Sequence, residues 1–403
     1  MRDVKCKHKL FTFKKMKELF RHHHLFQILS RFEMQKKPLD AFLSQYFRAN
    51  KSVGAKDRKF IAETVYDLIR WRGSLDHLAK KPLSWETRFA AYQTFSSTSF
   101  MEDLSAPLHV RVSFPKILFE HIRISYGEEE AKKIALTSNT PAPTTIRINP
   151  LKTTREELFE KWKKSFDVSL CPTSPLGIRF HKKINFFILP EFKQGLFEIQ
   201  DEGSQLVAAL VDARPGDQVL DFCAGAGGKS LAFAHKMQKQ GQIYLHDIRP
   251  WILQTAKKRM KRASIQNAQL LFSEKLLPSL HGTMDWLLLD VPCSGTGTLR
   301  RNPDMKWKFT NEFLSSLIEE QRAIFAKALP FLKKGGRIVY ATCSILPEEN
   351  QNQVEYFSQT FGLEVEKPSL AWLPHKGGMD GFFGAILKQN KKRAESGDQY
   401  PPL

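Results

Sequence analysis

The fold is decided by one stretch, Asp217-Gln-Val-Leu-Asp-Phe-Cys-Ala-Gly-Ala-Gly-Gly-Lys-Ser230. Its first part, residues 218–221, is short and apolar and ends in a carboxylate, which predicts a buried strand. The glycines that follow, Gly225, Gly227 and Gly228, allow the backbone to turn sharply and to approach a ligand without a Cβ clash. A helical run comes next. This order of strand, glycine turn and helix is how an α/β sheet binds a nucleotide-like cofactor.

Two better-known nucleotide-binding loops do not fit this stretch. A phosphate-binding P-loop would need a glycine where Cys223 stands, and a dinucleotide-binding loop would need one in place of Ser230. The pattern that remains, Asp-x-x-x-Gly-x-Gly-Gly, is typical of sites for S-adenosylmethionine (SAM). A plain glycine-rich turn between a strand and a helix is the alternative at this point.

The C-terminal half of the chain alternates short apolar runs with amphipathic ones. This alternation predicts a parallel sheet covered by helices on both faces, so the fold class is α/β with a Rossmann-like cofactor domain. A final apolar run at residues 381–388 predicts one more strand or hairpin arm. The predicted parallel strands are 218–221, 242–246, 268–272, 286–290 and 337–341, and the predicted helices are 230–240, 250–262 and 311–332.

The N-terminal half divides into two smaller parts. From Leu39 onwards apolar residues recur at helical spacing, which predicts amphipathic helices to about residue 135. Pro141 and Pro143 then mark a linker into a small α+β module. The elements predicted in this module are strands at 144–149, 178–180 and 185–189 and a helix at 155–165. The predicted domains are a basic extension (1–36), a helical domain (37–138), the α+β module (139–199), the cofactor domain (200–390) and a polar tail (391–403).

The charge of the chain favours a polyanionic partner. Its 403 residues carry a formal net charge of +20 and its pI is about 9.7, which indicates nucleic acid before a membrane. The basic residues are spread along the chain, and a helical scaffold with no role in RNA binding is the alternative for the N-terminal part. No apolar run approaches the ~20 residues of a membrane span. The basic N-terminus has no apolar core of a signal peptide, so a cytoplasmic protein without a membrane partner is expected.

The cysteines and histidines predict neither a disulfide framework nor a metal site. The cysteines are widely spaced without a Cys-x-x-Cys pair, so free thiols in a reducing compartment are expected. The run His22–His24 could bind a metal, but a solvated helix face is the favoured interpretation. The five cysteines are Cys6, Cys171, Cys223, Cys293 and Cys343.

Two acidic residues end predicted strands. Asp247 lies some 20 residues beyond the glycine turn, where a carboxylate can accept both ribose hydroxyls of a cofactor. Capping of the helix that begins near Pro250 is the alternative, and both can hold. Asp290 ends the fourth strand and begins Asp-Val-Pro-Cys-Ser-Gly-Thr-Gly297, a loop stiffened by proline and opened by glycine.

Two thiols are predicted to meet at the same edge of the sheet. Cys293 follows the fourth strand, and Cys343, in Ala-Thr-Cys-Ser, follows the fifth. For each cysteine alone, a small buried apolar residue is the simpler interpretation. Their placement at adjacent strand ends, beside a SAM-like turn, favours chemistry instead. Residues 300–308 then combine bases with Trp307, a mixture that suits a phosphate backbone and a stacked base.

A pyrimidine ring explains why thiols would be needed. Carbon 5 of the ring is a poor nucleophile, and a thiolate that adds to carbon 6 makes it able to attack a sulfonium methyl group. A base then removes the proton from carbon 5 and the thiol is eliminated, which is covalent catalysis. Asp290 could hold the amino and ring-nitrogen edge of the base, which favours cytosine, and the base must be unstacked to reach such a pocket.

These motifs resemble the Fmu/Sun-type RNA (cytosine-5)-methyltransferases, over about residues 140–388, and in particular a bacterial member of the ribosomal-RNA type. The pairing of Pro-Cys-Ser with Thr-Cys-Ser is the most specific part of the resemblance. The N-terminal part, with its motifs at 48–50 and 56–58, also resembles the front of bacterial members. The matching motifs are 200–205, 223–229, 290–297, 301–304, 342–344 and 380–383.

The resemblance implies roles for single residues. It makes Cys343 the nucleophile and Cys293 the residue that assists product release. Asp290, from its expected contact with the edge of the base, is the third predicted catalytic residue. The usual Pro of the family turn is Ala226 here, which keeps the turn without fixing φ. The third strand of the family usually ends in Asp, and Glu274 stands nearest to that position. The implied cofactor contacts are Cys223, Ala224, Gly225, Ala226, Gly227, Gly228, Lys229, Asp247, Glu274 and Asp290.

The resemblance therefore implies a SAM-dependent RNA cytosine-5 methyltransferase, expected to act on ribosomal RNA as a monomer. A transfer RNA enzyme with the same mechanism is one alternative. A non-catalytic RNA-binding ribosome assembly factor that keeps the fold is the other. A DNA cytosine methyltransferase uses the Pro-Cys thiol as its nucleophile, and the Thr-Cys-Ser motif argues against that class.

Overall fold

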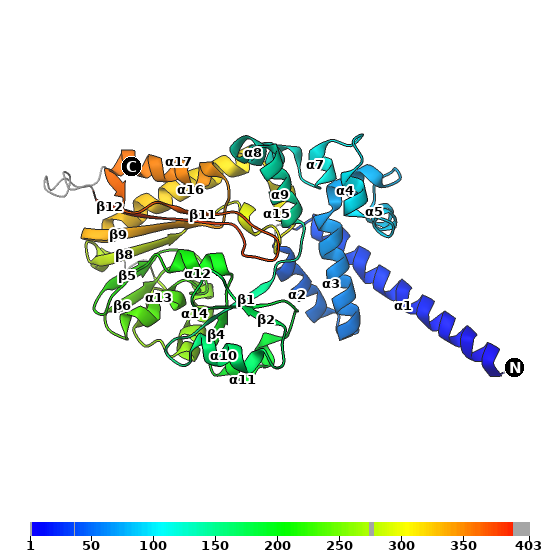
Figure 1. Cartoon of the computed structure of the whole chain (residues 1–403), viewed down its shortest axis with the longest axis horizontal. Coiled ribbons are helices and arrows are strands. Elements are labelled where there is room, and N and C mark those ends of the chain that lie inside the picture. The colour runs from blue at the N-terminus through cyan, green and yellow to red at the C-terminus, as the bar shows by residue number, and fades with distance from the viewer. Residues whose placement is uncertain (1, 36, 274–277, 390–403) are drawn as a thin grey trace. The chain divides into compact units, whose positions relative to one another are not determined.

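The computed structural model describes residues 2–35, 37–273 and 278–389, with side chains from Met16 onwards. It contains two compact units (Figure 1). The first, here called the helical unit, consists of residues 1–140 together with 299–309. The second, the sheet unit, consists of residues 141–298 and of the chain from 310 onwards. The predicted domain limits remain predictions, and the predicted tail at 391–403 lies outside the described residues.

The sheet unit is built on a large mixed sheet with the strand order β10-β12-β9-β8-β5-β6-β7, and β11 pairs with β12. Strands β5 to β9 are parallel, and β12, β10 and β11 add an antiparallel edge. The predicted parallel strands are confirmed, and so is the predicted last strand. The strands are β5 (Gln218–Asp221), β6 (Gln242–Leu245), β7 (Ala268–Leu270), β8 (Met284–Asp290), β9 (Leu332–Thr342), β10 (Leu363–Val365), β11 (Leu370–Trp372) and β12 (Phe382–Gln389).

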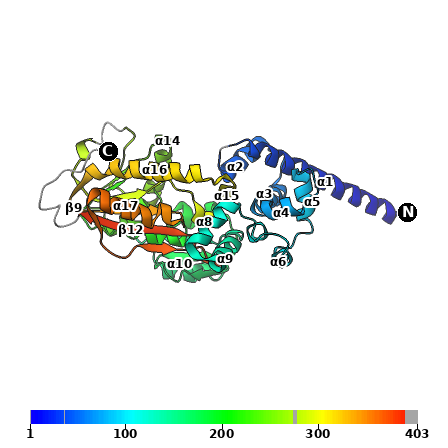
Figure 2. The same cartoon turned by 90° about the horizontal axis from the view of Figure 1, so that it is seen from above.

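Helices cover both faces of this sheet, as the alternation predicted (Figure 1). Along β8, Trp286 and Leu288 pack with one layer of helices, and Leu287 and Leu289 pack with the other. Strands buried on both faces are expected to be rich in apolar residues, as the run from Trp286 to Leu289 of β8 is. Figure 2 shows α16 and α17 on the same side of the sheet. The covering elements are α12 (Glu202–Ala208), α13 (Ser230–Phe233), η2 (Ala234–Met237), α14 (Pro250–Ala263), α16 (Asn311–Ala328), η6 (Leu329–Phe331) and α17 (Gln351–Phe361).

Two predicted helices of the sheet unit are shorter than expected. The run at 230–240 forms α13 and η2 and stops at Gln238, which takes a left-handed conformation with φ +48°. The run at 311–332 ends at Ala328, because Pro330 cannot continue an α-helix and the chain tightens into η6 before β9. The N-terminus of α16 is capped by Thr310, whose hydroxyl accepts the Phe313 N–H at 3.1 Å.

The α+β module lies within the sheet unit and has its own antiparallel sheet in the order β2-β3-β1-β4. The predicted strand at 185–189 is wrong. Asn185 caps a 3-10 turn by accepting the Phe187 N–H at 3.2 Å, and only Phe186 of that turn is buried. The elements are β1 (Thr144–Ile148), α10 (Arg155–Trp162), β2 (Val168–Leu170), β3 (Gly177–Phe180), η1 (Phe186–Ile188), α11 (Pro190–Lys193) and β4 (Phe197–Ile199).

The module is joined to the helices that cover the large sheet by buried polar bonds. Arg147 of β1 donates to the Gln200 side chain at 2.7 Å and to the carbonyl of Leu231 in α13 at 2.9 Å. Burial lowers the pKa of this guanidinium to about 10, although the Glu198 carboxylate opposes the effect. Glu198 of β4 also pairs with Arg259 of α14. The module is therefore a rigid neighbour of the helices that carry the glycine turn.

The helical unit is all-α and includes one segment from far along the chain. Residues 299–309 belong to it: the Trp307 indole donates to the carbonyl of Ile69 at 2.7 Å, and the buried Lys306 amine donates to that of Arg70 at 2.7 Å. The helices are α1 (Arg2–Glu33), α2 (Leu39–Ala49), α3 (Ala55–Arg70), α4 (Arg72–Leu78), α5 (Trp85–Tyr92), α6 (Ser97–Met101), α7 (Leu108–Arg111), α8 (Lys116–Tyr126), α9 (Glu128–Ser138) and α15 (Met305–Lys308).

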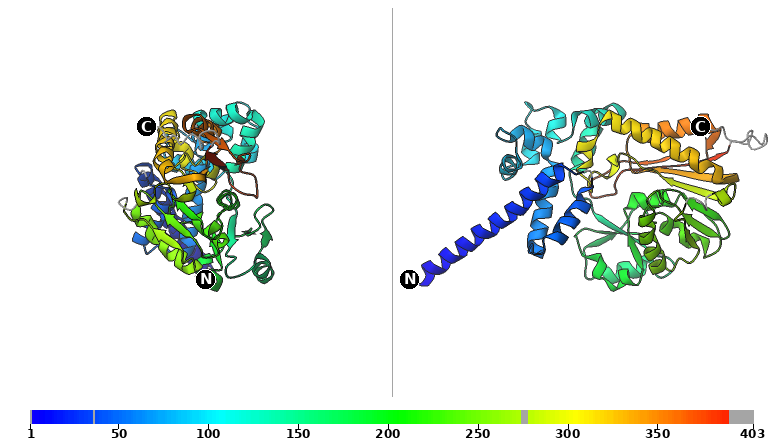
Figure 3. Two further views of the ribbon diagram at one scale, coloured as in Figure 1. Left: turned by 90° about the vertical axis from the view of Figure 1, so that its left-hand side faces the viewer. Right: turned by 180° about the vertical axis from the view of Figure 1, so that it is seen from behind.

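The second half of α1 belongs to the core of the helical unit (Figure 3). Leu25 and Ile28 are fully buried against α2 and α3. The prediction of a solvated face at His22–His24 is therefore wrong for His24, which is buried and bonds to the Tyr46 hydroxyl at 2.7 Å. Within the described ranges no cluster of His, Cys, Asp or Glu could hold a metal ion. None of the helices that the structure describes is long and apolar enough to cross a membrane.

Candidate active site

The glycine turn joins β5 to α13 at the carboxyl edge of the large sheet. Gly225 and Gly227 take left-handed conformations, with φ of +52° and +75°. A Cβ on Gly227 would lie 3.1 Å from the Met260 side chain and 3.2 Å from that of Ala256, so a side chain here would be crowded as well as strained by the positive φ. The carbonyl of Ala226 accepts an Arg259 N–H at 2.8 Å, which anchors the turn to α14. The backbone of the turn is therefore held in place, and its glycines carry no side chain.

Asp247 faces the glycine turn from the end of β6. Its Oδ2 accepts the Gly225 N–H at 2.8 Å, and its Oδ1 accepts the Arg249 N–H at 2.9 Å. Burial pushes the pKa of Asp247 up, but the hydrogen bonds from Arg249 and Gly225 outweigh burial, so the pKa lies below its usual value. The alternative role as a helix cap does not hold, because α14 is preceded by Arg249 and no side chain caps it.

Asp221 ends β5 beneath the same turn and is almost fully buried. The Ser230 hydroxyl donates to its Oδ2 at 2.6 Å, whereas its Oδ1 has no hydrogen-bond partner among the described residues. Burial raises the pKa of Asp221 to about 7, against the opposing bond from Ser230. A buried oxygen without a partner, beside a bare glycine turn, marks a place where a polar ligand group completes the structure.

Lys229 connects the glycine turn with the predicted catalytic loop. Its ammonium forms an ion pair with Asp290 at the end of β8. Burial disfavours the charged amine, but the Asp290 carboxylate outweighs burial and the pKa of Lys229 lies above its ordinary value. The Asp290 side chain keeps 32 % of its surface exposed, so it can still reach a ligand. The ring of Phe382 lies 5.9 Å from the Lys229 amine.

The structure brings Cys293 and Cys343 together, as the strand order predicted. β8 and β9 are neighbours in parallel register, and the two Sγ atoms lie 3.3 Å apart. The hydrogen bond with Cys343, and then burial, raise the pKa of the Cys293 thiol well above its ordinary value. The backbone N–H of Gly297 donates to the carbonyl of Cys343 at 2.9 Å, which ties the two loops.

The remaining cysteine of the predicted site, Cys223, lies in the glycine turn. Burial, and after it the carboxylates of Asp221 and Asp290, raise the pKa of its thiol well above the ordinary value, so it stays protonated. Cys171 is buried in the α+β module. Glu274, the predicted contact after the third strand, lies outside the described residues. The other predicted site residues gather at the carboxyl edge.

Sequence reasoning missed two residues that tie the cysteine loops together. Glu349 and Asn350 follow β9 and are buried, and they hydrogen-bond residues on both sides of the cysteines. Their only signal in the sequence is a polar run shortly after Thr-Cys-Ser, and burial cannot be inferred from such a run.

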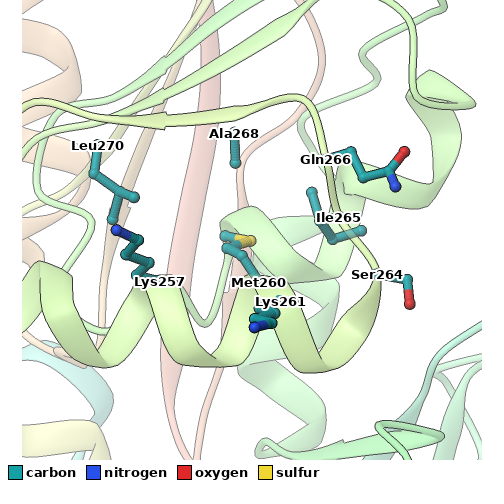
Figure 4. A pocket seen from close by; sticks show the side chains of 8 residues that line it. All are labelled: Lys257, Met260, Lys261, Ser264, Ile265, Gln266, Ala268 and Leu270. Atoms are coloured by element: carbon teal, nitrogen blue, oxygen red, sulfur yellow. The ribbon is translucent and has the colours of Figure 1, made fainter.

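A separate cavity of about 330 Å³ lies between α14 and β7 (Figure 4). Lys257, Met260 and Lys261 line it from the helix, and Ala268 and Leu270 line it from the strand. None of the predicted site residues lines this cavity. It is therefore distinct from the carboxyl edge where the glycine turn and the thiols lie.

The carboxyl edge fits SAM on features of the described residues. The bare turn at Gly225 and Gly227 admits a ligand close to the backbone, and Asp247 presents a buried carboxylate where ribose hydroxyls bind. The unpartnered oxygen of Asp221 adds an acceptor for a positively charged group. The Rossmann-like fold and this site define a SAM-dependent methyltransferase. A solved methyltransferase homologue from Pyrococcus horikoshii agrees: it is 26% identical, with a TM-score of 0.61 over 72% of this chain and 99% of its own.

The chain belongs to the family of the 16S rRNA methyltransferases RsmB/F, whose model matches residues 208–388, and the ferredoxin-like domain of RsmF/B-like proteins matches residues 114–186. A probable ribosomal RNA small subunit methyltransferase B of Synechocystis is 34% identical over 69% of this chain and 67% of its own length. Ribosomal RNA small subunit methyltransferase B of Proteus mirabilis is 31% identical over 76% of this chain and 71% of its own. The resemblance to the Fmu/Sun family, the fold class and the cofactor SAM are thereby confirmed.

Proposed function

We propose that this protein methylates carbon 5 of a cytosine in ribosomal RNA through a covalent bond between Cys343 and carbon 6 of the base. The observation that carries the proposal is the contact between the two thiols, 3.3 Å apart beside the Lys229–Asp290 pair. The net charge of +20 suits an RNA partner. The relatives described as ribosomal RNA methyltransferases favour that RNA. Action as a monomer in the cytoplasm belongs to the same proposal.

The reaction begins with the Cys343 thiolate. It adds to carbon 6 of the cytosine, and the electron pair released into the ring makes carbon 5 nucleophilic. SAM, when bound, would supply the methyl group on its sulfonium: carbon 5 would take the methyl as the methyl–sulfur bond breaks, with S-adenosylhomocysteine as the leaving group. A base then removes the proton from carbon 5, the bond between carbon 6 and sulfur breaks, and the methylated base leaves. The Lys229 ammonium interacts with Cys343, and a nearby cation stabilises a thiolate.

Asp290 gives the site its preference for cytosine. A carboxylate accepts a hydrogen bond from the amino group of cytosine, whereas uracil presents a carbonyl oxygen at that position and would face the carboxylate with a second acceptor. Leaving such a pair unsatisfied costs about 1–3 kcal/mol. Lys229 pairs with Asp290 and so holds this acceptor at the end of β8.

Cys293 assists the release of the product. Its thiol pKa is raised by Cys343 and by burial, so it carries a proton at neutral pH. At 3.3 Å it can donate its S–H to the sulfur of Cys343. That hydrogen bond stabilises the thiolate that forms when the bond to carbon 6 breaks. A residue that acts only at this stage leaves the first attack intact.

A denaturing gel tests the proposal directly. Wild type, Cys293→Ala and Cys343→Ala are each incubated with cellular RNA and SAM, with Cys171→Ala as the control for loss of a buried thiol outside the site. Cys293→Ala is expected to accumulate an RNA–protein adduct that survives denaturation, because attack proceeds and release does not. Cys343→Ala is expected to form none, and Cys171→Ala is expected to behave as wild type.

Other results on the gel would contradict all or part of this proposal. An adduct in Cys343→Ala but not in Cys293→Ala would exchange the two roles and move the mechanism toward the DNA type. No adduct in any lane, with RNA still bound, would favour the non-catalytic assembly factor. An adduct that forms with transfer RNA and not with ribosomal RNA would identify the transfer RNA enzyme instead.

A further inference from the structure

A buried carboxylate, that of Glu349, lies between the two cysteine loops. It ends η7 (Pro347–Glu349), the turn between the Thr-Cys-Ser loop and α17, and it is fully buried. The donors that bond its oxygens are neutral groups of Ser294 and Gln321. Burying a carboxylate without a basic partner is costly. The bonds that it makes explain why it is there.

Glu349 and Gln321 hold the two residues that flank Cys293. The Ser294 N–H donates to Oε1 of Glu349 at 2.8 Å, and the Ser294 hydroxyl donates to Oε2 at 2.5 Å. The side-chain amide of Gln321 donates to the same Oε1 at 3.1 Å and to the carbonyl of Pro292 at 3.0 Å. The backbone on either side of Cys293 is therefore fixed around one buried carboxylate.

The next residue, Asn350, does the same for Cys343. The Thr342 hydroxyl donates to Oδ1 of Asn350 at 2.5 Å, and the Asn350 amide donates to the carbonyl of Ser344 at 3.0 Å. Thr342 and Ser344 are the two neighbours of Cys343 in the chain. Asn350 thus holds both neighbours of Cys343 directly, whereas Glu349 holds Ser294 directly and Pro292 through Gln321.

We propose that the dipeptide Glu349-Asn350, here called the cysteine clamp, is the positioning device of the reaction. Glu349 sets the Cys293 loop, Asn350 sets the Cys343 loop, and the peptide bond between them fixes one loop against the other. The Tyr340 hydroxyl donates to the carbonyl of Glu349 at 2.8 Å, which fastens the clamp to β9. The inference rests on the proposed function, since the clamp matters to catalysis only if both thiols do.

The clamp also places a negative charge beside Cys293. Both oxygens of Glu349 accept hydrogen bonds, but burial outweighs these three donors, so the pKa of Glu349 lies above its usual value and the group carries its charge only above that raised pKa. A carboxylate at this position disfavours a second negative charge on Cys293. The groups that act on the Cys293 thiol are Cys343 and Glu349. Lys229 interacts with Cys343. Tyr340 interacts with Cys293, Glu349 and Arg322.

The two thiols interact with groups of opposite charge. The cation, Lys229, interacts with Cys343, and the carboxylate, Glu349, interacts with Cys293. Cys293 is thereby favoured as the thiol that donates its proton in a hydrogen bond to the leaving sulfur, which leaves Cys343 as the thiol that attacks. The clamp therefore gives two chemically identical side chains different surroundings.

Glu349→Gln tests the charge of the clamp without removing its shape. The amide oxygen can keep the bonds from Ser294 N–H and Gln321, and the amide nitrogen can donate to the Ser294 hydroxyl. Alkylation of Cys293 by iodoacetamide, followed peptide by peptide in a mass spectrometer, gives the pH midpoint of its ionisation. We expect the midpoint to fall by about one pH unit, because a neighbouring negative charge is lost.

The same variant is then examined on the denaturing gel across pH. Once Cys293 ionises it can no longer donate, so the adduct of Glu349→Gln should accumulate at a pH about one unit below that at which it does in wild type. Glu355→Gln, which neutralises an exposed carboxylate on α17, is the control and should match wild type in both measurements. An unchanged alkylation midpoint in folded Glu349→Gln would overturn the role of the charge. If Cys293→Ala traps no adduct the proposed function fails, and the alkylation midpoint still decides the clamp.

Asn350→Ala tests the positional part of the clamp. Loss of both bonds frees the Cys343 loop, and a displacement of about 1 Å in a reacting group costs about 100-fold in turnover. We expect kcat to fall by about that factor while SAM affinity, measured by calorimetry, stays within about twofold of wild type. An unchanged kcat in a folded variant would overturn the proposal for Asn350. Thermal unfolding of each variant shows that it is folded.

Discussion

The two halves of the carboxyl edge are built in different ways. The cofactor half, after β5 and β6, owes its shape to backbone conformation: two left-handed glycines and a strand-end carboxylate that accepts a backbone N–H. The thiol half, after β8 and β9, owes its shape to side-chain hydrogen bonds from the cysteine clamp. The comparison teaches that a backbone-built site is visible in a short motif, whereas a site built by side chains depends on residues outside its motifs.

The strongest way to break the cofactor half is Gly227→Ala. The new Cβ would meet the Met260 and Ala256 side chains at about 3.1–3.2 Å, in a backbone conformation with φ +75°. Strain of about 1–2 kcal/mol and crowding of about 1–3 kcal/mol disfavour the turn conformation that binds SAM, so the turn relaxes in the free protein and we expect about a 100-fold loss of SAM affinity. Isothermal titration calorimetry measures this change.

Gly216→Ala is the matched control for that prediction. Gly216 also has a positive φ, +96°, but a Cβ there would meet nothing within 4 Å. The control should lose some stability and keep its affinity for SAM. Equal losses of affinity in the two variants would mean that strain alone, and not the closed space at Gly227, governs the turn.

Asp247→Asn gives a smaller effect in the same half. The amide keeps one acceptor but loses the charge that strengthens bonds to ribose hydroxyls, and a charged hydrogen bond contributes about 1.5–3 kcal/mol. We therefore expect SAM to bind about 10-fold more weakly. Asp212→Asn, which changes an exposed carboxylate paired with Lys236, should bind SAM as wild type does. Affinity retained in Asp247→Asn would remove this residue from the cofactor site.

Asp221 predicts a modest effect of pH on the free protein. Its pKa is about 7 in the folded state and about 3.9 in an unfolded chain. The folded state therefore binds this proton more tightly, so stability contributed by Asp221 is present below pH 4 and is lost as the pH rises to 7. In Asp221→Asn this loss is absent.

Thermal unfolding without SAM tests the direction of this pH dependence of stability. The melting temperature of Asp221→Asn, relative to wild type, should rise by at least about 3 °C between pH 5 and pH 8, since one pKa unit corresponds to about 1.4 kcal/mol. Asp212→Asn should show no such rise. Parallel curves for wild type and Asp221→Asn would mean that Asp221 is not held protonated by its burial.

The halves also differ in how far the sequence predicts them. The positive φ of Gly225 and Gly227 can be predicted because both residues are glycines. The carboxylates Asp247 and Asp290 can be placed at strand ends because an apolar run stops at each of them. The meeting of the two thiols followed from the neighbouring positions of strands β8 and β9 in a parallel sheet.

The features that the sequence did not predict depend on burial by residues that are distant in the chain. Glu349 is acidic and stands in a polar run, yet it is fully buried because Ser294 and Gln321, far away in the chain, supply its donors. His24 is buried for a similar reason, since Tyr46 of another helix accepts or donates its hydrogen bond. The strand expected at 185–189 failed because a local cap by Asn185 competes with extended pairing.

The segment 299–309 has a consequence for the order of events during synthesis. It is part of the helical unit, where Lys306 and Trp307 bond to the carbonyls at the end of α3. The ribosome makes it only after the whole stretch from Pro141 to Thr298 has been synthesised. Domains usually form in the order in which they are translated. Here the helical unit lacks its last helix, α15, until most of the cofactor domain has been synthesised.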